Sequence, residues 1–552
     1  MARKAVIPLL LLTAFFAGFS TATIENPITQ QMIQEAARLI GISIADRHTH
    51  AMQRTLESQR SSLEVIRAAE LQNHTSPALH FRPFPVGFTP PQPHLPIKWQ
   101  IPTTVELPTN LDYLAWYSIP ELAYLIKHRK ISVVSLTEIF LKRLEKESDS
   151  LRAVVTITRQ RAMEQARLAD AEIARGEYRG ILHGIPYGAK DIFAVAGYPT
   201  TWGAEPFRTQ FFESDATVID KLDEAGAILI AKVSVGELAM GDVWFGGTTR
   251  NPWNLTQGSS GSSAGSASLV AAGFMPFSIG SETLGSIVSP STRSGATGLR
   301  PTFGRVSRKG AMALSWSMDK IGPIARNAID CAIVLEAIMG NDPLEPSTID
   351  ARMELPNAKD LKNLRIGFIR EFFDADYANR ENDQKVLNDL RSMGFTLHEV
   401  KWEIPLPVSA LRIILIAEAA AAFDQITLSG RDSLLVSQGA NAWPNIFRAA
   451  RFIPAVEYIN ANRIRSKLIE QLHTIMQNYD VIVVPSFGGN QLLATNLTGH
   501  PSLVAPNGFD ANGSPTSISF IGNLFEEGYL VVLADKWQQH TKHHTKRPPL
   551  FH

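Results

Sequence analysis

The sequence predicts an α/β fold with a largely parallel or mixed sheet. After about residue 150, short apolar runs typical of strands alternate with longer segments of helical periodicity. The stretch 257–301 contains three Gly/Ser clusters and an apolar run at 269–277. The apolar run indicates a buried segment, and the small residues on either side of it let the backbone come close to other groups. A chain of 552 residues is long enough to bury a large core around such a sheet.

The composition excludes several classes of protein. The chain has 53 Lys and Arg against 53 Asp and Glu, so no basic surplus is available for binding nucleic acid. The single cysteine, Cys331, excludes an intrachain disulfide and a metal site built from cysteines.

The first residues have the organisation of a secretory signal peptide. Arg3 and Lys4 precede an apolar run at 5–19, and Ser20 and Ala22 supply a small-residue cleavage pattern. The run is shorter than the roughly 20 apolar residues of a membrane-spanning helix. We therefore predict residues 1–22 to be a signal peptide and the protein to be secreted, periplasmic or otherwise exported, with no membrane span after cleavage. An uncleaved membrane anchor is the alternative.

Two segments precede the predicted sheet. Residues 23–75 are predicted as an N-terminal helical extension of two helices with a break near Gly41, because glycine is almost absent and apolar residues recur at helical spacing. His48 and His50 would point apart on a helix, which favours solvated histidines over a metal site. Residues 76–110 contain nine prolines and are predicted as an extended, Pro-rich arm.

Residues 111–540 form the predicted main domain. Two capping boxes, Ser118 to Glu121 and Ser135 to Glu138, predict the starts of a pair of helices. A basic, His-containing tail at 541–552 is expected to fray rather than to hold a metal. A strand at 153–157 and a helix at 161–175 follow the helical pair, and alternating strand and helix patterns continue at 184–189, 216–225, 227–232, 329–339, 364–369, 384–393 and 480–485.

Lys190 stands out because an apolar, strand-like segment precedes it. Burial disfavours the ammonium form and lowers its pKa, and a neutral amine can act as a base. The alternative is a structural lysine paired with a carboxylate such as Asp191. We expect Asp191 to point away from Lys190, because successive side chains on a strand face opposite sides.

Two serine-containing clusters offer competing nucleophiles. Residues 261–265 fit the G-x-S-x-G pattern of α/β-hydrolases, which would make Ser263 the nucleophile. That interpretation needs a downstream histidine, from His398, His473 or His500. Residues 280–290 instead surround Ser286 with small residues whose backbone N–H groups could hold an oxyanion.

Taken together, these stretches resemble the amidase signature family, which includes fatty acid amide hydrolase, bacterial amidases and the A subunit of tRNA-dependent amidotransferases. The resemblance implies the amidase signature fold, a central mixed β-sheet covered by helices on both faces, with the N-terminal helical extension outside this core. It is dense at 119–340 and reappears at 480–485 and 498–509. It is carried by Lys190, GSSGSSAGSA (258–267), GSETLGSI (280–287), GLRPTFGRVSRKG (298–310) and SMDKIGPIARNAIDCAIVLEAI (317–338).

The resemblance also implies a site, the family's Ser–cis-Ser–Lys triad. The triad falls on Ser286 as nucleophile, on Ser262 as a bridging serine in a cis Gly261–Ser262 peptide, and on Lys190 as base. A serine hydroxyl needs an adjacent base of this kind to become a good nucleophile. No metal or organic cofactor is required. The oxyanion hole would consist of the backbone N–H groups of Thr283, Leu284, Gly285 and Ser286.

The stretch around the nucleophile, Ser281-Glu282-Thr283-Leu284-Gly285-Ser286-Ile287-Val288, departs from the family's T-D-x-G-G-S-I-R pattern. Leu284 stands in place of a glycine and Val288 in place of an arginine. The triad is untouched, but the pocket wall near the nucleophile is altered. The identity of the substrate therefore does not follow from the resemblance.

We expect an exported amidase that hydrolyses the C–N bond of a small or non-peptide carboxamide through an acyl-enzyme on Ser286. Its substrate would be a small-molecule amide, and no nucleic acid would bind. The sequence is compatible with either a monomer or a homodimer. One alternative is a glutamine amidase that acts in a complex, as the A subunit of an amidotransferase does; the signal peptide and neutral charge balance argue against it. The other is a catalytically silent binding protein on the same scaffold, against which the intact triad argues.

Overall fold

The computed structural model describes residues 27–67, 73, 75, 79–357 and 360–551. The predicted signal peptide lies outside these residues and stays a prediction. The chain divides into two units, Met1–Leu71 and Gln72–His552. No helix in the described ranges combines the length and apolarity needed to cross a bilayer.

The described part of the first unit consists of two helices, α2 (Gln30–Leu39) and α3 (Asp46–Arg67), with the break where Gly41 predicted it. Thr29 caps α2 by accepting a hydrogen bond from the N–H of Met32. The His50 ring bonds to Gln53 within α3. Over the described ranges, no group of three or more His, Cys, Asp or Glu side chains is placed to hold a metal ion.

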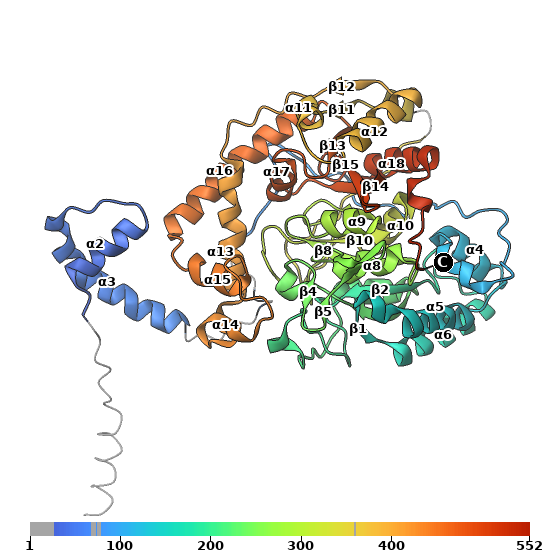
Figure 1. Ribbon diagram of the computed structural model, residues 1–552, viewed down its shortest axis with the longest axis horizontal. Coiled ribbons are helices and arrows are strands. Elements are labelled where there is room, and N and C mark those ends of the chain that lie inside the picture. Colours follow the sequence, from blue (N-terminus) through green and yellow to red (C-terminus); the bar gives the residue numbers. More distant parts are fainter. Residues whose placement is uncertain (1–26, 68–72, 74, 76–78, 358–359, 552) are drawn as a thin grey trace, which may run out of the picture. The chain divides into compact units, whose positions relative to one another are not determined.

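The second unit is built on a mixed sheet of eleven strands with helices around it, as predicted (Figure 1). Its strands β2 (Pro186–Lys190), β3 (Ile228–Val233), β10 (Lys320–Ala325) and β13 (Val481–Pro485) are buried at every residue, which is why they appear in the sequence as apolar runs. In spatial order the sheet is β1 (Val154–Ile157), β3, β2, β8 (Phe277–Glu282), β10, β9 (Thr297–Arg300), β14 (Ser502–Phe509), β15 (Pro515–Ile521), β13, β11 (Ile366–Phe368) and β12 (Leu397–Glu399).

The pairing in this sheet is parallel in two places and antiparallel elsewhere. Strand β2 runs parallel to both of its neighbours, β3 and β8. Strand β11 runs parallel to β12 and β13. Two small hairpins lie outside the sheet: β4 (Val243–Trp244) with β5 (Gly247–Thr248), and β6 (Arg250–Asn251) with β7 (Asn254–Gly258).

The helices of this unit follow the predicted alternation, and short 3-10 turns such as η1 (Leu111–Trp116) occur in the loops. The apolar run at 269–277 spans the end of one helix, α8, and the start of β8, and it is buried throughout. The helices are α4 (Ile119–Lys127), α5 (Val133–Glu147), α6 (Arg159–Ala174), α7 (Thr217–Glu224), α8 (Ala264–Ala271), α9 (Val288–Ser294), α10 (Ala328–Ile338), α11 (Arg370–Asp374), α12 (Arg380–Ser392), α13 (Arg412–Ala422), α14 (Asp424–Leu428), α15 (Trp443–Ala450), α16 (Ala455–Met476), α17 (Gln491–Thr498) and α18 (Glu527–Thr541).

One of the two capping predictions is confirmed and the other is wrong. The Glu121 carboxylate accepts the Ser118 N–H at 2.7 Å, which completes the box that opens α4. Helix α5 instead begins at Val133, ahead of its predicted first-turn signal. Its N-terminal N–H groups are satisfied by Ser132 and by the carboxylate of Asp170 on α6, which accepts from Val133 and Val134. The local cap is thus Ser132, three residues ahead of the predicted Ser135, and the part of the capping that Asp170 supplies from another helix leaves no local signal in the sequence.

The Pro-rich arm and the C-terminal tail are parts of the second unit and pack against its helices and loops. Residues 79–110 contain no helix or strand, and the carboxylate of Glu336 on α10 accepts hydrogen bonds from His94, Ile97 and Trp99 of this segment. The expectation of a frayed tail is wrong. Phe551 is buried, because its ring packs on Phe274 and its carbonyl group accepts a hydrogen bond from Arg143.

Candidate active site

Three segments distant in sequence meet where β2 and β8 end. The two strands are adjacent and parallel, with Tyr187 opposite Phe277 and Ala189 opposite Ile279. Their carboxyl ends therefore lie at the same edge of the sheet, the usual location of ligand sites in α/β proteins. Strand β2 delivers Lys190 to this edge, the turn before α8 delivers Ser262, and the turn after β8 delivers residues 283–286.

The amine of Lys190 is fully buried and surrounded by serine hydroxyl groups. Its Nζ donates to the Oγ atoms of Ser262 at 2.8 Å, Ser281 at 2.9 Å and Ser263 at 3.1 Å. Burial lowers the pKa of Lys190 to about 7, although the negative charges of Asp319 and Glu282 oppose this shift. A substantial fraction of the amine is therefore neutral near pH 7.

Asp191 points away from Lys190, as predicted. One of its carboxylate oxygens forms a buried ion pair with Lys232 at 2.6 Å, and the other accepts the N–H of Thr201 at 2.9 Å. The carboxylates that do act on Lys190 are those of Asp319 and Glu282. Both lie about a hundred residues further along the chain, and no pattern in the sequence assigned them this effect.

The peptide bond between Gly261 and Ser262 is cis, as the family resemblance implied. The next residue, Ser263, is engaged by the strand beside it. Its Oγ donates to the carbonyl group of Ser281 at 3.0 Å and accepts the Ser281 N–H at 3.2 Å, and its own N–H donates to the carbonyl group of Ser286 at 3.1 Å. Ser263 thus joins β8 to the turn that carries Ser286.

The α/β-hydrolase interpretation of Ser263 lacks its base in this structure. No histidine is hydrogen-bonded to Ser263 in the described part of the chain. His500 bonds instead to Thr498, and burial lowers its pKa to about 3. His398 is on the sheet-edge strand β12, and His473 is in α16.

The turn at 283–286 presents a row of backbone donors. Among the described residues, none of its four N–H groups has a hydrogen-bond acceptor, whereas the next two, those of Ile287 and Val288, donate to Glu282. Gly285 adopts a left-handed conformation, with φ at 79°, that favours glycine. Ser286 is 8% exposed. Of the three predicted triad residues, Lys190 and Ser262 are in direct contact, and no hydrogen bond joins the Oγ atoms of Ser262 and Ser286.

A cavity of about 420 Å³ reaches this cluster at Ser281 and Thr283. Thr283 donates its hydroxyl hydrogen to the partly buried carboxylate of Asp319 at 2.5 Å, so the cavity wall and the donor turn share a hydrogen bond. Asn73 also lines the cavity and exchanges two hydrogen bonds with the backbone of Ala313. The remaining wall combines apolar and aromatic side chains with charged ones. The apolar and aromatic residues include Ile192, Trp202, Phe212, Met312, Leu314 and Trp316, and the charged residues are Glu213, Asp215, Arg308, Lys309 and Glu345.

Comparison with known proteins identifies the scaffold. A family model described as Amidase matches residues 135–493, more than half of the chain. The chain belongs to the amidase signature family. The A subunit of glutamyl-tRNA(Gln) amidotransferase from Acinetobacter baumannii is 34% identical over 481 residues, which cover 78% of this chain and 97% of that protein. Its counterpart from Methylococcus capsulatus is also 34% identical, covering 78% of this chain and 98% of the relative.

Solved structures of amidases share the fold. The peptide amidase from Stenotrophomonas maltophilia superposes with a TM-score of 0.69 at 26% identity, covering 80% of this chain and 99% of the other. An amidase family protein from Bacillus anthracis gives a TM-score of 0.68 at 27% identity, covering 79% of this chain and 93% of the other. The amidase signature scaffold therefore accounts for most of the second unit.

Proposed function

We propose that this member of the amidase signature family is a hydrolase of carboxamides that works through an acyl-enzyme on Ser286. The observation that supports this most strongly is the contact between Lys190 and Ser262, 2.8 Å from Nζ to Oγ, formed by a lysine whose pKa is lowered to about 7. A buried lysine that is partly neutral near pH 7, with a serine hydroxyl as its neighbour, is arranged to accept a proton.

The proposed reaction first forms an acyl-enzyme and then hydrolyses it, and the same proton relay serves both steps. Neutral Lys190 takes the proton of Ser262, Ser262 takes that of Ser286, and the Oγ of Ser286 attacks the amide carbon. The N–H groups of residues 283–286 receive the negative charge on the carbonyl oxygen. The relayed proton passes to the departing nitrogen as the C–N bond breaks. Water then cleaves the ester on Ser286 through the same relay, which releases the carboxylic acid.

The cavity favours a substrate with an apolar substituent. Its aromatic and aliphatic wall includes Trp202, Phe212 and Trp316, and its volume of about 420 Å³ falls in the range of small-molecule sites. Such a wall desolvates an aryl or aliphatic group at little cost. We therefore propose an apolar carboxamide as the substrate class.

A glutamine amidase that acts in a complex is the second candidate. The names of the relatives at 34% identity, which are A subunits of glutamyl-tRNA(Gln) amidotransferases, favour it. An exported protein would not meet tRNA, so the proposed signal peptide at residues 1–22 favours the hydrolase. The two candidates use the same nucleophile and differ in substrate and partner.

Ser286 rather than Ser263 is expected to react with a fluorophosphonate probe. The hydroxyl group of Ser263 is held by Ser281 and Lys190, whereas Ser286 belongs to the turn at 283–286, whose N–H groups have no acceptor within the described part of the chain. Peptide mapping of the labelled protein should place the adduct on Ser286, and Ser286→Ala should abolish labelling. An adduct on Ser263, or loss of activity in His500→Ala with its fold intact, would contradict the assignment.

Activity is expected to rise with pH through a single ionisation near 7 and then to plateau. Lys190 must lose its proton before it can act as a base, so the protonated form below its pKa of about 7 is inactive. Lys190→Ala should keep the fold and lose on the order of 10²–10⁴ in rate. The control is Lys221→Ala, which removes another lysine with a burial-lowered pKa, one that bonds to Met339 outside the site. Equal rates for the two variants would remove Lys190 from the mechanism.

The purified protein is expected to hydrolyse aryl or aliphatic carboxamides with a kcat/KM about tenfold or more above that for L-glutamine. The reason is that an apolar wall discriminates by the apolar area it buries. Steady-state assays of ammonia or amine release across such a panel provide the measurement. A preference for glutamine together with a co-purifying partner protein would favour the second candidate instead.

The mature protein is expected to begin near residue 23. The basic start, the apolar run at 5–19 and the small residues Ser20 and Ala22 motivate this. N-terminal sequencing of protein recovered outside the cytoplasm is the measurement. A chain that retains Met1 and remains in the membrane fraction would indicate an anchor.

A further inference from the structure

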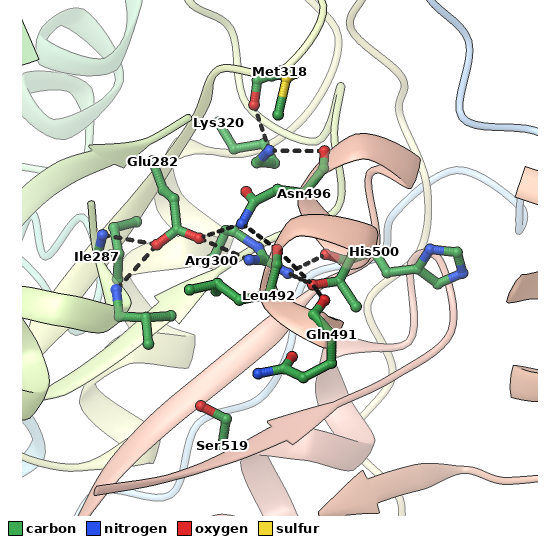
Figure 2. Close-up of polar contacts among 12 residues, drawn as sticks. Glu282, Ile287, Arg300, Met318, Lys320, Gln491, Leu492, Asn496, His500 and Ser519 are labelled. Carbon is green, nitrogen blue, oxygen red and sulfur yellow. Dashed lines mark hydrogen bonds and ion pairs between the residues drawn. The ribbon is translucent and has the colours of Figure 1, made fainter. Parts of the chain in front are cut away.

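One buried carboxylate closes the turn that carries Ser286. Glu282 is the last residue of β8 and is fully buried. Its Oε2 accepts the N–H of Ile287 at 2.8 Å and the N–H of Val288 at 3.0 Å, as Figure 2 shows. Glu282, just before the turn at 283–286, thus binds the backbone of Ile287 and Val288, just after the turn. The N–H groups in between, at 283–286, are the ones left without acceptors among the described residues.

A second set of contacts fixes the carboxylate itself. Its Oε1 accepts from Arg300 at 2.7 Å and from Asn496 at 2.9 Å. Arg300 is anchored in turn, because its other terminal nitrogen donates to the hydroxyl group of Thr495 and to the carbonyl group of His500, both at 2.9 Å (Figure 2). All four hydrogen-bonding positions of Glu282 are therefore filled by donors from β9, α9, its preceding turn, and α17.

Glu282 is ionised in this environment. Burial alone would raise the pKa of its carboxyl group. The charge of Arg300 and the hydrogen bonds from Arg300, Val288 and Asn496 outweigh burial and lower this pKa to about 2. Lys320 lies opposite Glu282 on β10, yet burial and the Arg300 charge hold its pKa well below its ordinary value. Its amine bonds to the carbonyl groups of Met318 and Asn496. Arg300 is thus the counter-ion of Glu282.

We propose that Glu282 is a positioning residue for the reaction, which holds Ser286 and the N–H donors of residues 283–286 in the shape that receives the transition state. The inference rests on the proposed function. Hydrogen bonds that an ionised carboxylate accepts are stronger than neutral ones, so they define the turn more tightly than those to an amide oxygen would. Oxyanion donors must lie within a few tenths of an ångström of their target to be effective, so a looser turn costs rate rather than binding.

Glu282 also contributes to the field at Lys190. The charged groups that act on the Lys190 amine are Asp319, which bonds to Thr283, and Glu282; both raise the pKa that burial lowers. Around Glu282 itself, the charged partner is Arg300, and burial holds the pKa of the neighbouring Lys320 well below its ordinary value. Removal of the Glu282 charge would therefore lower the pKa of Lys190 and move the rise of activity to lower pH.

The test is Glu282→Gln in the full-length protein, assayed on an apolar carboxamide across pH. Glutamine keeps the size of the side chain but loses the charge, and its NH₂ group cannot accept from Arg300. We expect kcat to fall on the order of 10- to 100-fold, KM to change by less than about threefold, and the midpoint of the pH profile to move down. A change that only weakened the fold would lower the amount of active protein without moving this midpoint.

The matched control is Glu527→Gln. Glu527 is also fully buried, pairs with Arg305 at 2.6 Å and accepts the backbone N–H of Thr302 at 2.8 Å, but it contacts no residue of the turn at 283–286. The Glu527→Gln variant should have a lower melting temperature than the wild type, while its folded fraction keeps the wild-type kcat and pH midpoint. If Glu282→Gln does not fold, Asn496→Ala removes one donor to Oε1 and should lower kcat severalfold with KM retained.

Wild-type kcat and an unmoved pH midpoint in folded Glu282→Gln, or in folded Asn496→Ala when the first variant does not fold, would overturn the inference. So would equal losses of kcat in Glu282→Gln and Glu527→Gln. The proposed function fails by a different result, namely a wild-type protein that hydrolyses no amide or a Ser286→Ala variant that retains activity. The two failures are therefore distinguishable.

Discussion

The burial of one amine, that of Lys190, is the constraint on which the rest of this site depends. A lysine in water is a cation near pH 7 and useless as a base, and only the loss of its hydration brings its pKa down to about 7. That loss requires a position between buried strands, which β2 occupies between β3 and β8. It also requires neighbours that hydrogen-bond without charge, and the hydroxyl groups of Ser262, Ser263 and Ser281 are such neighbours.

The surrounding carboxylates are arranged so that none becomes the counter-ion of Lys190. Asp191, its neighbour in sequence, is paired with Lys232, and Glu282 is paired with Arg300. Asp319 is satisfied by the hydroxyl group of Thr283 and by the N–H groups of Leu314 and Ser315. Each buried charge thus has its own donors, because an unpaired one would cost several kcal/mol and would draw the proton onto Lys190. The ion pairs of the core and the basicity of the lysine are parts of one arrangement.

The strands and helix starts that could be predicted are those whose sequence signal is local. Apolar runs identified β2, β3 and β13, because these strands are buried on both faces, and the Ser118 box identified the start of α4 because its cap is local. The start of α5 was placed three residues too late, because Ser132 rather than Ser135 is its N-cap and Asp170 on another helix holds its first two N–H groups. The assignment of Lys190, Ser262 and Ser286 to one site came only from family resemblance. The structure places Lys190 in contact with Ser262, and that contact depends on strand order, which no local pattern encodes. No sequence pattern indicated that Ser281 bonds to Lys190 or that Asp319 raises the pKa of Lys190. Both effects arise between segments that are distant in sequence.

The two opposing influences on Lys190 explain why its pKa settles near 7 instead of falling further. Burial favours the neutral amine, while the fields of Asp319 and Glu282 favour the cation. A base with a much lower pKa would be neutral at all working pH values but would accept a proton poorly, whereas one near 7 combines availability with proton affinity. Glu282 and Asp319 both also bond to the turn at 283–286 or its flanks. In the proposed mechanism, the groups that shape the oxyanion donors are therefore the same groups that raise the pKa of the base, so a change in one half of the site is expected to alter the other.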